Sequence, residues 1–316
     1  MTTVAVLDDY QGVALASADW SPLAGRADVV VFTEHLADPD ALVAALGPFD
    51  VVVAMRERTA FGADVLRRLP DLRLLVTTGA SNAAIDVAAA RAQGVTVCGT
   101  GASAAAAPEL TWALLMALVR QVPVEDGNVR AGRWQTTVGC ELAGRTLGLL
   151  GLGRIGARMA RYAAAFDMDL IAWSQNLTDE AAHAHGVTRV EKDELFRRAD
   201  VVSVHVRLSD RTRGLVGADE LRLLGPDGLL VNTSRGPIVD EAALLAALHD
   251  GTIGGAALDV YSLEPLAADD PWRSAPNTVL TPHIGYVTAE QYRVWFADVV
   301  EDVVAWLDGA PIREVR

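Results

Sequence analysis

The sequence predicts an α/β protein made of two lobes, each a doubly wound parallel sheet. Short apolar runs rich in Val and Leu alternate with Ala-rich helical stretches along the whole chain. Such a βαβ rhythm is typical of a parallel sheet with helices on both faces. The 316 residues, of which 51% are hydrophobic, are about twice the ~150 residues usual for one domain and can form large cores.

The first series of elements occupies roughly the first hundred residues. Apolar runs of four or five residues predict strands at 4–7, 51–54, 72–76 and 95–98. Stretches with a helical period and a capping residue near their start predict helices at 39–46, 63–69 and 85–93. A longer apolar helix is expected over 109–120, placed between two sheets rather than on the surface of one.

A second series follows. Its strands are expected at 147–150, 170–173, 201–206, 229–232 and 256–260, and its helices include 155–166, 192–198 and 241–249. The amphipathic stretch 289–307 is long enough to return to the first lobe. We therefore expect two α/β lobes with a cleft between them.

Charge and cysteine content argue against several classes of function. The chain has 27 Lys and Arg against 41 Asp and Glu, a net charge of −14 with no basic block, which argues against nucleic-acid binding. Cys98 and Cys140 offer neither a metal-site spacing nor a disulfide framework. The apolar runs are too short to cross a membrane, and the first residues do not resemble a signal peptide. These observations predict a soluble cytoplasmic protein without a metal or a membrane partner.

A glycine-rich turn joins a predicted strand to a predicted helix at residues 148–156 (GLLGLGRIG). Gly151, Gly153 and Gly156 form a G-x-G-x-x-G pattern, in which the first glycine allows a tight turn and the second allows close approach of a pyrophosphate. The third lets the helix and the strand pack closely. In this context the pattern predicts a dinucleotide site, with the anion at the start of the helix.

The residue after the next strand bears on which dinucleotide is bound. NAD sites usually have an acidic residue there to bind the ribose 2′-hydroxyl, and this chain has Ser174, followed by Gln175 and Asn176. Because these positions contain no acidic residue, they would not repel a 2′-phosphate. Because they contain no Arg or Lys, they would not attract one either. The prediction is a nicotinamide cofactor, NAD with NADP also possible.

Candidate catalytic residues follow the last predicted strands. Arg235 comes just after the strand 229–232, where its planar guanidinium could bind a carboxylate through two bonds. His283, in the restricted turn Thr281–Gly285, is the histidine we expect to exchange protons, whereas His205 is expected to be a packed ring. Reduction of a 2-keto acid needs a hydride donor, a carboxylate anchor and a proton donor.

Four ordered segments then make the sequence similar to the D-isomer-specific 2-hydroxyacid dehydrogenase family, including its phosphoglycerate dehydrogenase branch. The segments are 148–156, 232–244 (NTSRGPIVDEAAL), 254–265 (GGAALDVYSLEP) and 281–285 (TPHIG). The resemblance implies a Rossmann-type cofactor domain, residues 102–286, inserted into a flavodoxin-like substrate domain formed by residues 1–101 and 287–316.

The resemblance also implies roles for individual residues. Arg235 would anchor the substrate, His283 would be the general acid and base, and Glu264 would be its partner. The backbone of Ser81 and Asn82 would bind the substrate carboxylate beside Arg235. Residues implied to bind the cofactor are Gly151, Gly153, Arg154, Ile155, Gly156, Ser174, Val206, Thr233, Asp259 (to the carboxamide) and Gly285.

The leading prediction is therefore an NAD(P)-dependent dehydrogenase of small D-2-hydroxy acids, with glyoxylate, hydroxypyruvate and 3-phosphoglycerate types all open. Arg56 and Arg58 could meet a second anionic group, although the reading as solvated loop charges is slightly favoured. The alternative is a non-catalytic NAD-sensing protein like the corepressors that share this fold. The family is usually homodimeric, which here would involve residues 132–140, including Trp134.

Overall fold

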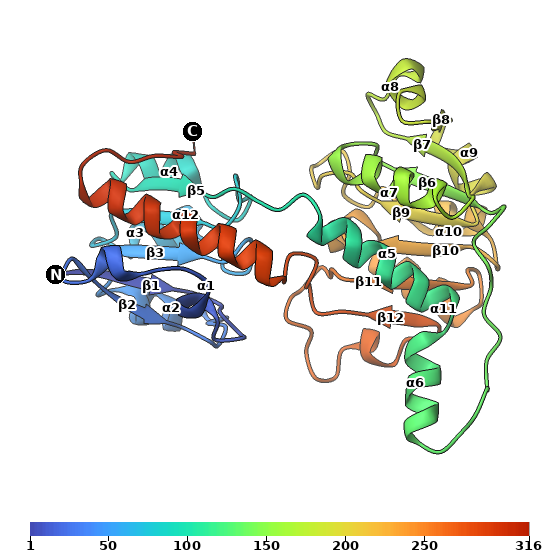
Figure 1. The fold of residues 1–316 in the computed structure, drawn as a ribbon, viewed down its shortest axis with the longest axis horizontal. Coiled ribbons are helices and arrows are strands. Elements are labelled where there is room, and N and C mark those ends of the chain that lie inside the picture. Colours follow the sequence, from blue (N-terminus) through green and yellow to red (C-terminus); the bar gives the residue numbers. More distant parts are fainter. Residues whose placement is uncertain (316) are drawn as a thin grey trace. The chain divides into compact units, whose positions relative to one another are not determined.

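The chain forms two compact units in a computed structural model that describes residues 1–315. Unit 1 comprises Met1–Ser103 and Val287–Arg316, and unit 2 comprises Ala104–Tyr286. Each unit contains a single parallel sheet with helices on both faces (Figure 1). The prediction of two doubly wound lobes, the second inserted into the first, is confirmed.

Unit 1 has a five-stranded parallel sheet in the order β2-β1-β3-β4-β5, which is the flavodoxin-like order 2-1-3-4-5. The strands are β1 (Thr2–Val6), β2 (Ala27–Val31), β3 (Val51–Ala54), β4 (Leu74–Thr77) and β5 (Thr96–Gly99). All residues of β3 and β4 are buried, as expected for central strands covered on both faces.

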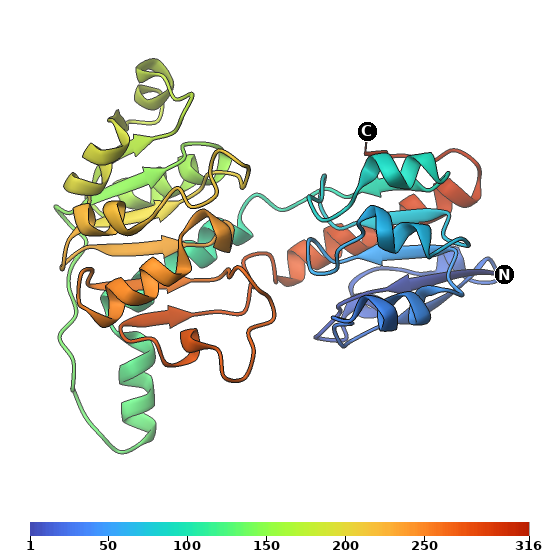
Figure 2. The same cartoon turned by 180° about the vertical axis from the view of Figure 1, so that it is seen from behind.

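The helices of unit 1 cover the two faces of this sheet. One face carries α2 (Pro39–Leu46), α3 (Ala63–Arg67) and α4 (Val87–Ala92), as Figure 2 shows, and the other carries α1 (Ala14–Ser17) and α12 (Ala289–Leu307). Helix α12 begins at Thr288, whose side chain accepts a hydrogen bond from Gln291 N. The predicted helix 289–307 therefore completes the first lobe.

Unit 2 has a seven-stranded parallel sheet in the order β12-β11-β10-β9-β6-β7-β8. The strands are β6 (Thr146–Leu150), β7 (Asp169–Trp173), β8 (Thr188–Arg189), β9 (Val201–Val204), β10 (Leu229–Asn232), β11 (Gly255–Leu258) and β12 (Thr278–Leu280). The chain proceeds outward from β6 to β7 and β8, then returns to β9 on the other side of β6. The strand order thus reverses between β6 and β9.

Two apolar cores enclose this sheet. On one face α5 (Ala106–Val119) and α7 (Arg154–Ala164) pack on alternate strand residues such as Leu147 and Val231. On the other face α9 (Lys192–Arg198), α10 (Ala218–Leu224) and α11 (Glu241–His249) pack on the intervening residues, including Val202 and Leu230. Helices α6 (Val122–Arg130) and α8 (Asp179–His183) and the short turns η1 (Ser21–Leu23), η2 (Gly236–Ile238) and η3 (Pro271–Ser274) complete the molecule.

The sequence reading missed the edge strands β2, β8 and β12, which have five, two and three residues. It also missed α6, whose sequence VPVEDGNVR contains a proline and a glycine and is poor in regular apolar spacing. In the described part of the chain, none of the helices combines the length and the apolar character needed to cross a membrane.

A buried carboxyl group in α12 makes the stability of unit 1 depend on pH. Asp302 is fully buried, its Oδ1 accepts a hydrogen bond from Arg313 Nε (3.0 Å), and its Oδ2 has no hydrogen-bond partner among residues 1–315. Burial raises the pKa of Asp302 to about 7, although Arg313 opposes the shift. The folded protein therefore retains a proton that the unfolded chain releases between about pH 4 and pH 7.

We expect the free energy of unfolding to fall as the pH rises through this window, because the unfolded state binds fewer protons there. The Asp302 contribution is about 2–4 kcal/mol, and Asp302→Asn should remove it. Urea denaturation at about pH 5 and pH 8 measures the effect in both proteins. An equal pH dependence in wild type and variant would contradict the assignment.

Candidate active site

The glycine-rich turn lies at the reversal of strand order in unit 2. It joins the end of β6 to the start of α7, and ligands of open α/β sheets bind outside the carboxyl ends of strands at such a point. Gly151 has φ +108°, and a Cβ there would lie 2.8 Å from the backbone of His205 and Val206, which follow β9. A Cβ on Gly156 would lie 2.2 Å from Gly151 O. Both positions therefore require glycine.

The same turn fits the phosphates of a dinucleotide. A Cβ on Gly153 would meet no atom within 4 Å, so the space in front of this residue is open. Gly153 is also the N-cap of α7 and has no side chain to cap it, so the first N–H groups of the helix, from Arg154 onward, are available to an anion. The residues present therefore fit a bound pyrophosphate.

The end of β7 lies directly beside this turn, because Gly151 N donates a hydrogen bond to Trp173 O (2.8 Å). Ser174 follows as predicted, and no acid occupies its position. The next residue, Gln175, accepts hydrogen bonds through Oε1 from Nε (2.7 Å) and Nη2 of Arg211. Sequence reasoning missed Arg211, which lies 36 residues further along and reaches this position only through the fold.

The loops after β9 and β10 are tied together. Ser234 Oγ donates to Val206 O (2.6 Å), and the hydroxyl oxygens of Thr233 and Thr111 are 2.7 Å apart. Val206 and Thr233, both predicted to contact the cofactor, therefore lie in adjacent loops at the carboxyl edge of the sheet.

His283 and Glu264 form a direct pair. His283 Nδ1 lies 2.6 Å from Glu264 Oε2, and both side chains are partly buried, with 16% and 29% of their areas exposed. Glu264 Oε1 also accepts a hydrogen bond from Tyr261 N (2.8 Å), which fixes the carboxylate. Because Nδ1 is directed at the carboxylate, Nε2 is the nitrogen left to exchange protons with a ligand.

Asp259 holds the turn that contains His283. The carboxylate is 1% exposed and accepts hydrogen bonds from Thr281 Oγ1 (2.6 Å), Ile284 N (2.8 Å) and Gly285 N (2.8 Å). Burial raises the pKa of Asp259, and these hydrogen bonds and His283 partly oppose the shift. Sequence reasoning missed this positioning contribution, which follows from two distant loops meeting in the fold.

Arg235 lies three residues after β10, at the same edge of the sheet as the loops of Glu264 and His283. Its Nη1 donates to Ser234 O (2.7 Å), and Asn232 Nδ2 donates to Arg235 O (3.0 Å). A Cβ on Gly236 would lie 2.1 Å from the carbonyl carbon of Tyr261. This close approach holds the Arg235 loop against the segment that leads to Glu264.

His205 has a different environment from His283. Its Nε2 lies 2.8 Å from Ser203 Oγ, and burial lowers the pKa of His205 to about 4. The ring is therefore neutral near pH 7 and packed beside the glycine-rich turn, as the sequence reading expected for this histidine.

In unit 1 the predicted substrate-binding residues lie in the turn after β4. Ser81 is exposed, whereas Asn82 is buried and its Nδ2 donates to Arg56 O (2.5 Å) and Thr77 Oγ1 (3.0 Å). Asn82 Oδ1 accepts from Ala84 N (2.8 Å). The Asn82 side chain thus shapes the turn, and only its backbone is available for the predicted role.

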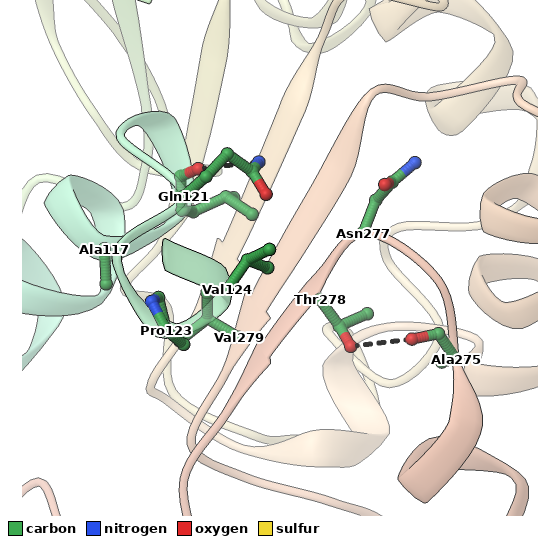
Figure 3. A pocket seen from close by; sticks show the side chains of 9 residues that line it. Ala117, Gln121, Pro123, Val124, Ala275, Asn277, Thr278 and Val279 are labelled. Atoms are coloured by element: carbon green, nitrogen blue, oxygen red, sulfur yellow. Dashed lines mark hydrogen bonds between the residues drawn. The ribbon is translucent and has the colours of Figure 1, made fainter. Parts of the chain in front are cut away.

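A pocket of about 240 Å³ lies elsewhere in unit 2, between the start of α6 and the amino end of β12 (Figure 3). Its lining is Ala117, Leu118, Gln121, Pro123, Val124, Ala275, Asn277, Thr278 and Val279. Since His283 follows the carboxyl end of β12, this pocket lies at the opposite end of the strand from the candidate catalytic pair.

Comparison with known proteins shows which proteins share this sequence and fold. Residues 112–285 match the family described as D-isomer specific 2-hydroxyacid dehydrogenase, NAD binding domain. A glyoxylate reductase of Aeropyrum pernix is 38% identical over 256 residues, which cover 78% of this chain and 76% of that protein. A D-3-phosphoglycerate dehydrogenase of Archaeoglobus fulgidus is 34% identical over 264 residues, 83% of this chain.

The chain spans about half the length of that phosphoglycerate dehydrogenase, since the match covers 50% of it. Among solved structures, a phosphoglycerate oxidoreductase from Vibrio cholerae superposes with a TM-score of 0.93 at 37% identity, covering 98% of this chain and 100% of the other. The likeness therefore includes both units.

Proposed function

Because the chain belongs to the D-isomer specific 2-hydroxyacid dehydrogenase family, we propose that it reduces a small 2-keto acid to the D-2-hydroxy acid with a nicotinamide cofactor. The observation that carries this proposal is the 2.6 Å pair of His283 Nδ1 and Glu264 Oε2 at the edge where the glycine-rich turn can hold a dinucleotide. The relatives reported above are named as dehydrogenase, reductase or oxidoreductase, and they give no support to an NAD-sensing corepressor.

In the proposed mechanism His283 is the general acid of the reduction. When bound, the reduced nicotinamide supplies a hydride to the keto carbon. His283 Nε2 donates a proton to the carbonyl oxygen, and the Glu264 carboxylate stabilises the imidazolium that carries this proton. In the reverse direction neutral His283 accepts the hydroxyl proton.

Binding of the substrate carboxylate is assigned to Arg235, whose planar guanidinium can donate two parallel hydrogen bonds to it. For unit 1, carboxylate binding is assigned to the backbone N–H groups of Ser81 and Asn82. Asn232 and Gly236 support the Arg235 loop and are assigned as positioning residues.

Cofactor binding is assigned to the residues around the carboxyl edge of the unit 2 sheet. The backbone at Gly153, Arg154 and Ile155 would hold the pyrophosphate, since the space there is open and the N–H groups are uncapped. The ribose would lie beside Ser174, and Val206 and Thr233 would line the adjoining loops. Asp259 and Gly285 would lie at the carboxamide end.

The environment of Arg56 favours a substrate without a phosphate group. Its Nη1 donates to the carbonyls of Thr78 (2.8 Å) and Ser81 (3.4 Å), and its Nη2 lies 3.2 Å from Glu57 Oε1. The guanidinium is thus neither a solvated loop charge nor an uncompensated cation.

The Arg58 side chain also contacts other groups of the protein. Its Nη1 donates to Asp8 O (2.6 Å), and its guanidinium lies 4.3 Å from the centre of the Tyr10 ring. With both arginines engaged and Glu57 adding a negative charge beside them, these loops favour glyoxylate or hydroxypyruvate over a phosphorylated keto acid.

The experiment is a comparison of kcat/KM for glyoxylate, hydroxypyruvate and 3-phosphohydroxypyruvate, measured by oxidation of NADH and NADPH. We expect the two unphosphorylated acids to be preferred by at least ~10-fold, a discrimination typical of one unfavourable charge contact. Glu57→Gln should narrow this difference. The control is Asp71→Asn, which makes the same charge change. Asp71 precedes β4, at the amino ends of the strands of unit 1, whereas Glu57 follows the carboxyl end of β3.

No turnover of any keto acid would contradict the proposed enzyme activity. Preference of the wild-type protein for the phosphorylated acid would instead contradict the substrate assignment alone.

A homodimer is also part of the proposal, because apolar side chains are exposed on α6 and the loop that follows it. Trp134 is 76% exposed and Val138 97%, and Val122, Val124 and Val129 are also among the exposed large hydrophobic residues. Burial of such side chains against a second copy would offset their hydration cost. Sedimentation of a monomer at micromolar concentration would contradict this assignment.

A cytoplasmic location is proposed from the two cysteines. Cys98 and Cys140 are both free thiols, as is usual for proteins of reducing compartments. Recovery of the protein from a secreted fraction rather than from cytosol would contradict it.

A further inference from the structure

We infer that Arg211, held by Gln175 beside Ser174, forms a binding site for the 2′-phosphate of a nicotinamide cofactor, so that this chain takes NADP(H). The inference deepens the proposed function and rests on it for the identity of the cofactor. It concerns the part of the site that would hold the adenosine ribose. There the residues that directly follow β7 include neither an acidic nor a basic side chain.

The location of the site follows from the backbone. Gly151 N donates to Trp173 O, so the residues after β7 begin next to the glycine-rich turn. A dinucleotide whose pyrophosphate lies on this turn places its adenosine ribose at the end of this strand. Ser174 offers a hydroxyl where a carboxylate would bind the two ribose hydroxyls and repel a phosphate.

Arg211 reaches this position from the loop after β9, the strand that lies on the other side of β6 from β7. The turn of this loop is fixed by the bonds of Thr212 Oγ1, which accepts from Ser209 N (2.8 Å) and donates to Arg207 O (2.6 Å). Val206 and Leu208, at the start of the loop, pack on the same apolar core as Trp173. The guanidinium is therefore carried by an anchored loop.

The partner of Arg211 is a neutral amide. Gln175 Oε1 accepts hydrogen bonds from Nε and Nη2 of Arg211, two of the five N–H donors of the guanidinium. Because the amide is neutral, the positive charge of Arg211 stays uncompensated. Among residues 1–315 no carboxylate lies within ion-pair distance of Arg211, although the chain as a whole has a net charge of −14. An exposed arginine that is spared from ion pairing and held by the residue next to Ser174 is suited to a phosphate dianion.

The test measures binding without turnover. Titration calorimetry with NADPH and NADH, and with the fragments adenosine 2′,5′-bisphosphate and 5′-AMP, gives the contribution of the 2′-phosphate. We expect the wild-type protein to bind the phosphorylated member of each pair about 10- to 100-fold more tightly at low ionic strength, and less selectively at high salt.

Two variants and a control assign this selectivity to the site. Arg211→Gln should weaken NADPH binding about 10-fold and leave NADH binding within a factor of about two. Ser174→Asp should weaken NADPH binding and favour NADH, because the new carboxylate repels the phosphate. Arg213→Gln removes the same charge two residues away in the same loop and should leave the ratio unchanged.

Two results would overturn the inference: equal or weaker binding of NADPH relative to NADH by the wild-type protein, or equal losses for both cofactors in Arg211→Gln. Neither result depends on whether a keto acid is turned over. Absence of turnover with selective NADPH binding would contradict the proposed enzyme activity and leave the phosphate site intact.

Discussion

His283→Ala is expected to lower kcat for keto-acid reduction by about 10²–10⁴-fold, the usual contribution of a positioned general acid. The reason is geometric: Glu264 Oε2 lies 2.6 Å from Nδ1, which directs Nε2 to the substrate as the proton donor. Cofactor affinity should persist, because the glycine-rich turn is built by β6 and α7 and does not include this residue. Stopped-flow oxidation of the reduced cofactor and calorimetric binding measure the two effects separately.

The matched control is His249→Ala, which removes an exposed imidazole from the last turn of α11. It should leave kcat unchanged within about twofold, as is usual for a surface substitution. A His283→Ala enzyme that turns over at a comparable rate would remove this histidine from the mechanism. Glu264→Gln should produce a smaller loss, because the neutral amide can still accept a bond from Nδ1 but no longer stabilises the imidazolium.

Arg235→Lys is expected to lower kcat/KM by about 10²–10³-fold, mainly through a higher KM for the keto acid. Lysine keeps the positive charge but lacks the planar pair of donors that can bind both carboxylate oxygens. Affinity for the cofactor should change little. Steady-state kinetics with glyoxylate at saturating cofactor measure the effect.

Arg222→Lys provides the control, since Arg222 is an exposed residue paired with Asp219 in α10. If Arg235→Lys retained the wild-type KM, the carboxylate would have to bind elsewhere. A partial rescue of the Arg235→Gln enzyme by added guanidinium, but not by added ammonium, would support the two-bond geometry.

The architecture could be predicted from the sequence because its central strands are buried on both faces. The runs at β3 and β9 are fully buried and almost wholly apolar, so their positions are marked without reference to the rest of the fold. Edge strands lack this signal. In strand β2 exposed residues alternate with buried or half-buried ones, and β8 has only two residues, so both become recognisable only when the neighbouring strand is in place.

The features of the candidate site that are local in sequence could be predicted, and those that depend on tertiary contacts could not. The glycine pattern at 148–156 is local and could be predicted. Gly151 and Gly156 answer contacts within the turn or with the adjoining loop, and Gly153 leaves open space for a ligand. The position of Arg211 could not, because its contact with Gln175 spans 36 residues. The bonds from Asp259 to the His283 turn span 22 to 26 residues and depend on β11 and β12 being neighbours.

The most direct measurement follows a labelled hydride. The protein is mixed with hydroxypyruvate and NADPH or NADH deuterated at nicotinamide C4, and the product is analysed by NMR and chiral chromatography. We expect D-glycerate carrying deuterium at C2, formed by the wild-type enzyme and lost in His283→Ala. Cofactor that binds but is never oxidised, or a product of the L configuration, would contradict it.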